Sequence, residues 1–259
     1  QFTSIVRKPC GATITIVMAK ENNKKIFLWS GPRNISTALM YSFAQRSDTF
    51  VVDEPLYGHY LSHSSAKPFH PGAEEILSKM ETDGKKVVEG MIGPQQKPVA
   101  FFKNMSHHLI QLDWQFMTAG ANIILTRNPE EMLLSFSKVI GQPGMDDVGY
   151  AMQWKLMEYL QTMQLPFVVI DAKKVLLNPE GQLRKLCDFL SLPFKEDMLN
   201  WDKGPIPEDG VWAKYWYNNV HLSTGFQRYE KKEMVFPKQL LPLLRECQPI
   251  YDRLVKHAL

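Results

Sequence analysis

The sequence predicts a single α/β domain built on a doubly wound, mainly parallel five-stranded sheet. Short segments rich in Val, Ile and Phe alternate along the chain with segments whose apolar residues recur at helical spacing. Such alternation is typical of parallel strands joined by right-handed crossovers, with helices on both faces. The 259 residues are enough for one such domain with a full core. The predicted strands are 26–29, 49–53, 99–103, 122–126 and 167–171.

Five helices and one long covering loop complete the predicted domain. The loop is 201–217, a segment rich in Pro, Gly and aromatic residues. The domain is predicted to span 25–259 after an N-terminal extension of residues 1–24. Two interpretations of the extension stay open, an added edge strand at 12–18 or an upstream segment before a native start at Met18. The predicted helices are 73–80, 108–118, 129–140, 147–163 and 179–190.

The segment IFLWSGPRNISTALMYSF at 26–43 predicts a site for an anion. A buried strand ends in a Ser-Gly-Pro turn, and a helix begins near Ser36. The free N–H groups and the positive dipole of a helix start favour negative charge. Arg33 adds a guanidinium that can bind two phosphate oxygens, and Ser36 and Thr37 add hydroxyls. A phosphate is therefore the expected ligand, although the loop G-x-x-x-x-G-K-[ST] of ATPases is not matched.

A second segment, RNPEEMLLS at 127–135, predicts another phosphate contact. Arg127 follows a buried strand directly, and Asn128, Pro129 and Glu131 are typical of the first residues of a helix. Ser135 lies eight residues after Arg127. A strand-end guanidinium and a hydroxyl on the next helix can converge on one dianion. The alternative is an arginine that only pairs with a neighbouring glutamate, beside a solvated serine.

Together the two segments resemble the phosphate motifs of the sulfotransferases. The pattern P-[KR]-x-x-[ST]-T at 32–37 is similar to their 5′-phosphosulfate loop, and Arg127 and Ser135 match their 3′-phosphate motif. The resemblance implies a P-loop NTPase-like architecture and 3′-phosphoadenosine 5′-phosphosulfate (PAPS) as co-substrate, with adenosine 3′,5′-bisphosphate as product. One departure is an isoleucine where family loops usually have Gly. The implied 5′ loop is Arg33, Asn34, Ile35, Ser36 and Thr37.

A late segment, HLSTGFQRYEKK at 221–232, is a further candidate for the cofactor site. In the family, a late loop with Arg, Lys and Gly closes over the 3′-phosphate. The usual R-K-G triplet is absent here, and a plain surface turn is the alternative. The residues that could replace the triplet are Ser223, Thr224, Gly225 and Arg228.

Two candidates compete to be the general base that removes the acceptor proton. Glu54 follows the second strand, where sulfotransferases that carry Arg in the 5′ loop place a glutamate. His107, or its neighbour His108, follows the third strand together with Lys103, an approximate match to the Lys and His of the cytosolic enzymes. Glu54 is ranked slightly ahead of His107. Arg33 is predicted to be an electrostatic clamp, because a guanidinium stays charged near neutrality.

Composition limits the function without specifying it. A net charge of +3 is too mild for a dedicated nucleic-acid binder, and no apolar run approaches the ~18 residues that span a membrane. Three scattered cysteines without a C-x-x-C pair suggest neither disulfides nor a metal site, and favour a reducing, cytoplasmic location. The expected partner is a small-molecule or carbohydrate acceptor, and a homodimer stays open.

Two other function classes remain as alternatives. One is a degenerate P-loop nucleotide kinase or hydrolase, and the other is a non-catalytic nucleotide-binding module that keeps the cofactor site. Survival of Glu54, Lys103 and His107 favours an enzyme over the module.

Overall fold

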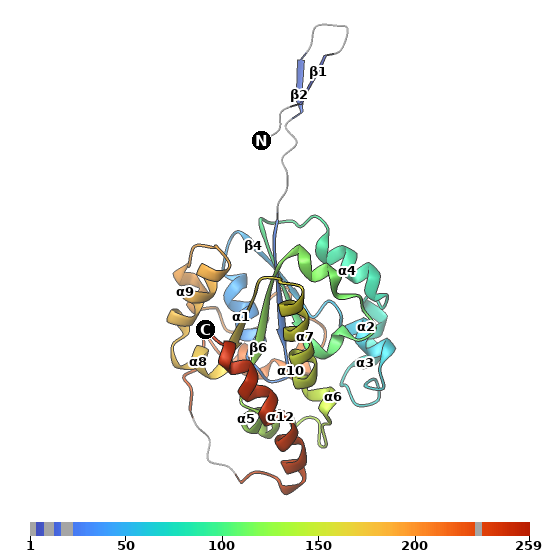
Figure 1. The fold of residues 1–259 in the computed structure, drawn as a ribbon, viewed down its shortest axis with the longest axis vertical. Coiled ribbons are helices and arrows are strands. Elements are labelled where there is room, and N and C mark those ends of the chain that lie inside the picture. The colour runs from blue at the N-terminus through green and yellow to red at the C-terminus, as the bar shows by residue number, and fades with distance from the viewer. Residues whose placement is uncertain (1–3, 8–12, 17–22, 231–234) are drawn as a thin grey trace.

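Five parallel strands form the central sheet of the domain, in the order β4-β5-β3-β6-β7 (Figure 1). The computed structural model describes residues 4–7, 13–16, 23–230 and 235–259. Every neighbouring pair in this sheet is parallel, so the connections are crossovers that place helices on both faces. The predicted fold class is confirmed. The strands are β3 (Lys24–Ser30), β4 (Thr49–Asp53), β5 (Val99–Met105), β6 (Ala121–Thr126) and β7 (Phe167–Asp171).

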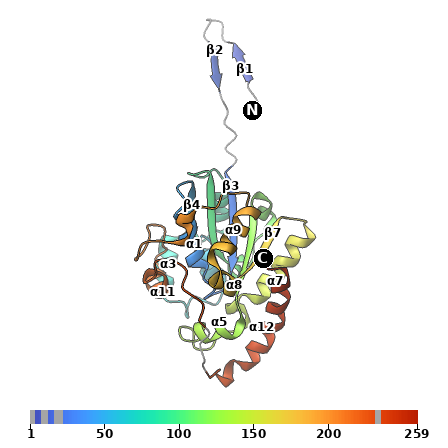
Figure 2. The same ribbon diagram turned by 90° about the vertical axis from the view of Figure 1, so that its left-hand side faces the viewer.

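Side chains of the central strand, β3, alternate between two separate hydrophobic cores. Ile26 and Leu28 pack with α1 (Ser36–Ala44), α8 (Ala172–Leu177) and α9 (Pro179–Phe189). Phe27 and Trp29 pack on the opposite face with α4 (Gly84–Ile92), α7 (Tyr150–Thr162) and α12 (Leu241–Leu254). Figure 1 shows α1, α8 and α9 on one side of the sheet and α4 and α7 on the other, and Figure 2 shows α12 beside α7. Because strand side chains alternate between faces, one apolar strand stabilises both layers.

The remaining helices are short and follow the carboxyl ends of strands or the late part of the chain. α2 and α3 pack with residues 211–217 in a small apolar cluster, and α5 packs against α12 in another. These clusters surround the edge of the sheet where ligands bind in α/β folds. The helices are α2 (Tyr57–His63), α3 (Ala73–Lys79), α5 (Pro129–Phe136), α6 (Met145–Val148), α10 (Ala213–Trp216) and α11 (Asn218–His221).

The predicted helix at 108–118 is wrong. The chain instead forms two 3₁₀ turns, η1 (Ser106–Leu109) and η2 (Trp114–Ala119). Ile110 is extended, and Gln111 has a left-handed φ of 54°, so the helix cannot continue. The predicted helix 147–163 is likewise divided at Gly149, whose φ of 78° separates α6 from α7. The predicted loop 201–217 carries the short helix α10 near its end.

Two short strands of the N-terminal extension pair with each other, and its last residue, Lys24, already belongs to β3. Strands β1 (Ser4–Arg7) and β2 (Thr13–Ile16) pair antiparallel with each other. The edge strand predicted at 12–18 is therefore wrong for 13–16, because these residues pair with β1 and not with the five-stranded sheet. Residues 12, 17 and 18 of that prediction lie outside the described residues. In the described chain, no helix is long and apolar enough to cross a membrane.

Candidate active site

The turn after β3 places the first residues of α1 at the carboxyl edge of the sheet, where they stay accessible. Arg33 and Ile35 both adopt left-handed backbone angles, with φ of 57° and 60°, and α1 begins at the next residue, Ser36. No side chain caps the first N–H groups of α1. The Ser36 and Thr37 hydroxyls have no hydrogen-bond partner among the described residues, and both line the adjoining cavity. The helix start is thus free to bind an anion.

Direct contacts join the two phosphate motifs predicted from the sequence. Arg33 Nε donates to Ser135 Oγ at 3.0 Å, and Arg127 Nη1 donates to the Arg33 carbonyl at 2.8 Å. Arg127 also pairs with Glu131 at 3.1 Å. Burial, and secondarily the charge of Arg127, lowers the pKa of Arg33. Two guanidiniums held this close together favour a bound anion, because an anion relieves their mutual repulsion.

The start of α5 fixes the second motif as the sequence indicated. Asn128 is the N-cap, and its Oδ1 accepts from the Glu130 and Glu131 N–H groups. Pro129 occupies the first turn. Tyr150 Oη donates to the Arg127 carbonyl at 2.7 Å, which ties this strand end to α7. The Arg127 side chain therefore projects from a backbone that is held on two sides.

A cavity of about 950 Å³ unites these residues with the other predicted positions. Of the predicted site residues, only Thr224 does not line it. Two exposed lysines that the sequence analysis did not select, Lys138 and Lys173, also line the cavity. The predicted residues that the cavity brings together are Arg33, Asn34, Ile35, Ser36, Thr37, Glu54, Lys103, His107, His108, Arg127, Ser135, Ser223, Gly225 and Arg228.

The late segment is only partly arranged as a ligand loop. Ser223 Oγ accepts from Trp201 Nε1 at 3.1 Å and donates to the Val220 carbonyl at 2.8 Å, so its hydroxyl has internal partners. The Thr224 carbonyl accepts from the Trp201 N–H, and the Thr224 side chain is exposed away from the cavity. Arg228 is exposed on the cavity wall. Within this group, Arg228 is the side chain best placed to reach an anion.

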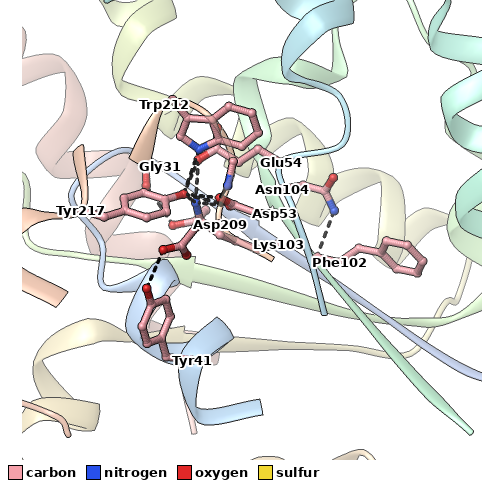
Figure 3. A network of polar contacts seen from close by, with 12 residues as sticks. Gly31, Tyr41, Asp53, Glu54, Phe102, Lys103, Asn104, Asp209, Trp212 and Tyr217 are labelled. Carbon is pink, nitrogen blue, oxygen red and sulfur yellow. Dashed lines mark hydrogen bonds and ion pairs between the residues drawn. The ribbon is translucent and has the colours of Figure 1, made fainter. Parts of the chain in front are cut away.

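Lys103 is enclosed between two carboxylates (Figure 3). Its ammonium lies 2.9 Å from Asp53 Oδ1 and 2.6 Å from Glu54 Oε1, and its side chain is 1% exposed. The Tyr217 hydroxyl completes this group, because it also bonds Lys103 and Asp53. A buried lysine with three partners is held in place, here at the wall of the cavity. Lys103 bonds its neighbours in this geometry, and its catalytic role stays a prediction.

The two carboxylates beside Lys103 have different surroundings. Both Asp53 oxygens accept hydrogen bonds, Oδ1 from Lys103 and Oδ2 from the Gly210 N–H at 3.1 Å. Glu54 accepts from Lys103 through Oε1, while Oε2 has no partner among the described residues and is not sealed from the cavity. The Glu54 side chain is 10% exposed, against 1% for Asp53. Burial raises the pKa of Glu54 and Lys103 opposes that rise, so the free oxygen is suited to take a proton.

The two adjacent histidines are buried in an aromatic cluster. The His108 ring stacks on the rings of Tyr57 and Tyr60, with centroid separations of 4.9 and 4.6 Å. His107 packs edge-on against Tyr60. Burial, and secondarily His70, lowers the pKa of His107 to about 3, and burial also lowers the pKa of His108. Both Nδ1 atoms are enclosed without a partner among the described residues. Neutral imidazoles of such low basicity are poor general bases near neutral pH.

Sequence reasoning missed Tyr217 along with the two lysines. Trp212 Nε1 donates to Tyr217 Oη at 3.0 Å, and both side chains line the cavity. The aromatic composition of 201–217 indicated a covering segment, but nothing in the pattern distinguishes Tyr217 from the other aromatic residues there. Among the described residues, no group of three or more His, Cys, Asp or Glu side chains could hold a metal ion.

Comparisons with known proteins identify the family of this chain. The family profile described as a sulfotransferase domain matches residues 24–258. Branched-chain-amino-acid aminotransferase-like protein 2 of Arabidopsis thaliana is 44% identical over 234 residues, which cover 90% of this chain and 41% of that protein. The chain thus spans about two-fifths of the length of the curated relatives it matches.

Two solved structures align with most of the chain at low sequence identity. The sulfotransferase domain of the Synechococcus PCC 7002 olefin synthase is 14% identical, with a TM-score of 0.48 and coverage of 86% of this chain and 94% of that one. A sulfotransferase from Alicyclobacillus acidocaldarius is 15% identical, with a TM-score of 0.46 and coverage of 89% and 94%. The profile match extends over nearly the whole described domain, so this chain belongs to the sulfotransferase domain family.

Proposed function

We propose that this protein is a PAPS-dependent sulfotransferase. The observation that carries the proposal is the contact between the two phosphate motifs, with Arg33 on Ser135 and Arg127 on the Arg33 backbone beside an uncapped helix start. A nucleotide with phosphates at both the 5′ and 3′ positions would match two such neighbouring anion sites. In this proposal the α1 start, with Ser36 and Thr37, holds the 5′-phosphosulfate, and Arg127 with Ser135 holds the 3′-phosphate.

The proposed reaction is a single displacement at sulfur. Glu54 Oε2 takes the proton of an acceptor hydroxyl or amine, and the acceptor atom attacks the sulfur. The bond between sulfur and the bridging oxygen breaks, and adenosine 3′,5′-bisphosphate leaves with the electron pair. Arg33 and the N–H groups of α1 stabilise the negative charge that develops on the leaving phosphate. Arg33 does so as a fixed charge, without donating a proton.

The cavity is divided in a way that supports separate donor and acceptor positions. Five cations line it outside the group around Glu54 and are called the cationic wall, although Glu130, Glu131 and Glu230 also line the cavity. The cationic wall consists of Arg33, Arg127, Lys138, Lys173 and Arg228. A continuous aromatic wall adjoins it, in which ring contacts run from Phe136 through Trp216 and His70 to Tyr57. Glu54 lies on the cavity side near Tyr57 and Tyr217. We place the acceptor against the aromatic wall, which suits a small molecule or a sugar ring.

The cellular location and the oligomeric state are also part of this proposal. Three cysteines without a C-x-x-C pair support a cytoplasmic location, and a homodimer stays a prediction. The aminotransferase-like name of the relatives describes proteins of which this chain matches 41%, and transamination is not part of the proposal.

Thermal unfolding with added nucleotides tests the cofactor assignment. Adenosine 3′,5′-bisphosphate should raise the melting temperature far more than ATP or AMP at equal concentration, because a ligand that binds only the folded state stabilises it. Equal or larger shifts with ATP would contradict the proposal and favour a nucleotide kinase or hydrolase.

A transfer assay then tests activity. With ³⁵S-labelled PAPS and a panel of hydroxyl and amine acceptors, label should move to at least one acceptor. Tight nucleotide binding without transfer to any of them would favour a non-catalytic nucleotide-binding module.

A further inference from the structure

The Tyr217 hydroxyl lies at the centre of the charged group around Glu54 (Figure 3). It is 2.8 Å from both Asp53 oxygens and 3.5 Å from Glu54 Oε1, and it contacts the Lys103 ammonium. Tyr217 is 5% exposed and lies between α10 and α11, more than 100 residues from Lys103 in sequence. A distant covering segment thus supplies a polar atom to the surroundings of the proposed base.

Apart from Glu54 Oε2, every donor and every carboxylate oxygen of this group has a hydrogen-bond partner. Lys103 has three N–H donors, and they meet Asp53, Glu54 and Tyr217. The Tyr217 hydroxyl has one proton, which goes to Asp53, and its oxygen accepts from Lys103 and from Trp212 Nε1. Asp53 is then bound on both oxygens, and only Glu54 keeps a free one. Removal of the Tyr217 hydroxyl would leave one Lys103 donor and one Trp212 donor unpaired in a buried site.

We propose that Tyr217 is a positioning residue for the base: its hydroxyl fixes Lys103 between the two carboxylates, so that Lys103 binds one oxygen of Glu54 and leaves the other directed into the cavity. The inference rests on the proposed function of Glu54. It assigns Asp53 as the anchor of the covering segment, because Gly210 and Tyr217 of that segment both donate to it. Asp53 therefore connects the position of residues 210–217 to the geometry of the base.

The same covering segment has a second anchor, at Asp209, that provides a control. Asp209 Oδ2 accepts from Tyr41 Oη at 2.7 Å and lies 2.9 Å from His221 Nε2. Tyr41 makes no hydrogen bond to Asp53, Glu54 or Lys103. Tyr41→Phe thus removes a buried tyrosine hydroxyl that bonds an aspartate at the covering segment, without touching the group around Glu54.

The experiment compares Tyr217→Phe with Tyr41→Phe in the full chain. Melting temperatures with and without adenosine 3′,5′-bisphosphate show whether each variant folds and keeps the cofactor site. Transfer from labelled PAPS gives kcat, KM for the acceptor and the pH–rate profile. Tyr217→Phe should lower kcat by about 10-fold or more with nucleotide binding retained, since it loses hydrogen bonds to charged groups. Tyr41→Phe should keep kcat within a few-fold of wild type.

The pH profile distinguishes positioning from a purely structural effect. The groups that face Glu54 are Asp53 from β4, Lys103 from β5, Tyr57 from α2 and Tyr217. The charge and the hydrogen bond of Lys103 hold the pKa of Glu54 down, so loss of the Tyr217 hydroxyl that fixes Lys103 beside Glu54 should move the acid limb of the profile to higher pH. Tyr41→Phe should leave that limb in place.

Three outcomes would overturn the inference. The first is Tyr217→Phe with wild-type kcat and pH profile, and the second is equal loss of kcat in both variants without a shift of the acid limb. The third is a Tyr217→Phe protein that folds poorly while Trp212→Phe, which removes the donor to Tyr217 Oη and shortens a ring packed against Tyr57, shows no partial loss of kcat. Failure of the proposed function itself looks different, because wild-type protein would then show neither nucleotide stabilisation nor transfer.

Discussion

Ile35 carries an unusual backbone conformation at the start of α1. Its φ of 60° lies in the left-handed region, which costs a β-branched residue roughly 1–2 kcal/mol. The sulfotransferase resemblance places Gly at this position, and Gly adopts such angles at little cost. The structure thus gives a physical reason for the usual Gly, and indicates that this chain retains the turn with a strained residue. Ile35 is half-buried and packs on the core around α1, which offsets part of the strain.

The strained backbone at Ile35 predicts that Gly at this position is more stable than Ala, the reverse of the order expected inside a helix. Ile35→Gly and Ile35→Ala both lose the packing of the side chain, but only Gly relieves the left-handed backbone. We expect Ile35→Gly to be more stable than Ile35→Ala by about 1 kcal/mol in urea unfolding. At Ala38, inside α1, Ala38→Gly should instead destabilise by about 0.5–1 kcal/mol. An Ile35→Ala protein as stable as Ile35→Gly would show that the turn does not hold this residue left-handed.

Arg127 should determine selectivity for the 3′-phosphate. In Arg127→Ala we expect affinity for adenosine 3′,5′-bisphosphate to fall by about 10- to 100-fold, the size of a lost charge-assisted hydrogen bond, with little change for AMP. Titration calorimetry measures both. Arg184→Ala, at an exposed arginine on α9 paired with Glu180, is the matched control and should change neither. Equal losses for both nucleotides would make Arg127 structural, through its bond to the Arg33 carbonyl.

Substitutions at Glu54 and at His107 should lower kcat to different extents. Glu54→Gln keeps the size of the side chain but not its basicity, so kcat should fall by about 10²–10⁴-fold while stabilisation by adenosine 3′,5′-bisphosphate persists. His107→Ala should lower kcat less, because burial keeps the pKa of His107 near 3. Burial raises the pKa of Glu54, so the rate should increase with pH as Glu54 ionises. A larger loss in His107→Ala than in Glu54→Gln would assign the base to His107.

At the scale of elements, the five strands were predictable because their signal is local. Each buried strand is a short run rich in β-branched or aromatic residues, and burial on both faces makes that run continuous. The 3₁₀ turns η1 and η2 were not predictable from the same periodicity. The apolar residues of 108–118 recur as in a helix, but the left-handed Gln111 divides them, and nothing in a glutamine indicates that angle.

Turn η1 should make folding stability depend on pH in a defined direction. In the unfolded chain a histidine binds its proton near pH ~6.5, whereas burial holds the pKa of His107 at about 3. Between these values the unfolded state binds more protons, so stability should fall as the pH falls through this window. One fully linked proton gives a slope of about 1.4 kcal/mol per pH unit.

Urea unfolding between pH 4.5 and 6.5 measures that slope. His107→Phe keeps an aromatic ring beside Tyr60, and its stability should decline less steeply with falling pH than that of wild type. His63→Phe, at an exposed histidine, is the control and should retain the wild-type slope. Identical slopes in wild type and His107→Phe would show that His107 is not buried as described.

At the scale of the whole molecule, the site divides into parts that sequence does and does not specify. Arg33, Glu54 and Arg127 were predictable because each lies within three residues of the end of a strand, and parallel strands bring their carboxyl ends to one edge. Tyr217 was not predictable in this way, because its role depends on how residues 201–221 fold back over that edge. Lys138 and Lys173 were missed for a related reason, since the turn after α5 and the helix α8 bring them to the cavity without any local motif.

These two lysines should act on the rate of nucleotide association. Both are exposed at the cationic wall, Lys173 with its ammonium 5.0 Å from the Tyr229 ring centroid, so solvent and salt screen their charges. Screened charges at the rim of a site steer an anionic ligand more than they hold it. In stopped-flow measurements of Trp fluorescence, Lys138→Ala and Lys173→Ala should each slow association of adenosine 3′,5′-bisphosphate several-fold and weaken its salt dependence. Dissociation should stay near the wild-type rate.

Whether a substitution changes the association rate or the dissociation rate distinguishes residues at the rim of the site from residues in its interior. Arg127→Ala should instead speed dissociation, because Arg127 is held against the Arg33 backbone inside the cavity. Lys185→Ala, at an exposed lysine on α9 that does not line the cavity, is the control for loss of one positive charge from the whole protein. If Lys185→Ala slowed association as much as Lys173→Ala, net charge and not the cationic wall would steer the nucleotide. If Lys173→Ala changed dissociation alone, Lys173 would bind the ligand directly and would belong with Arg127 in the 3′-phosphate site.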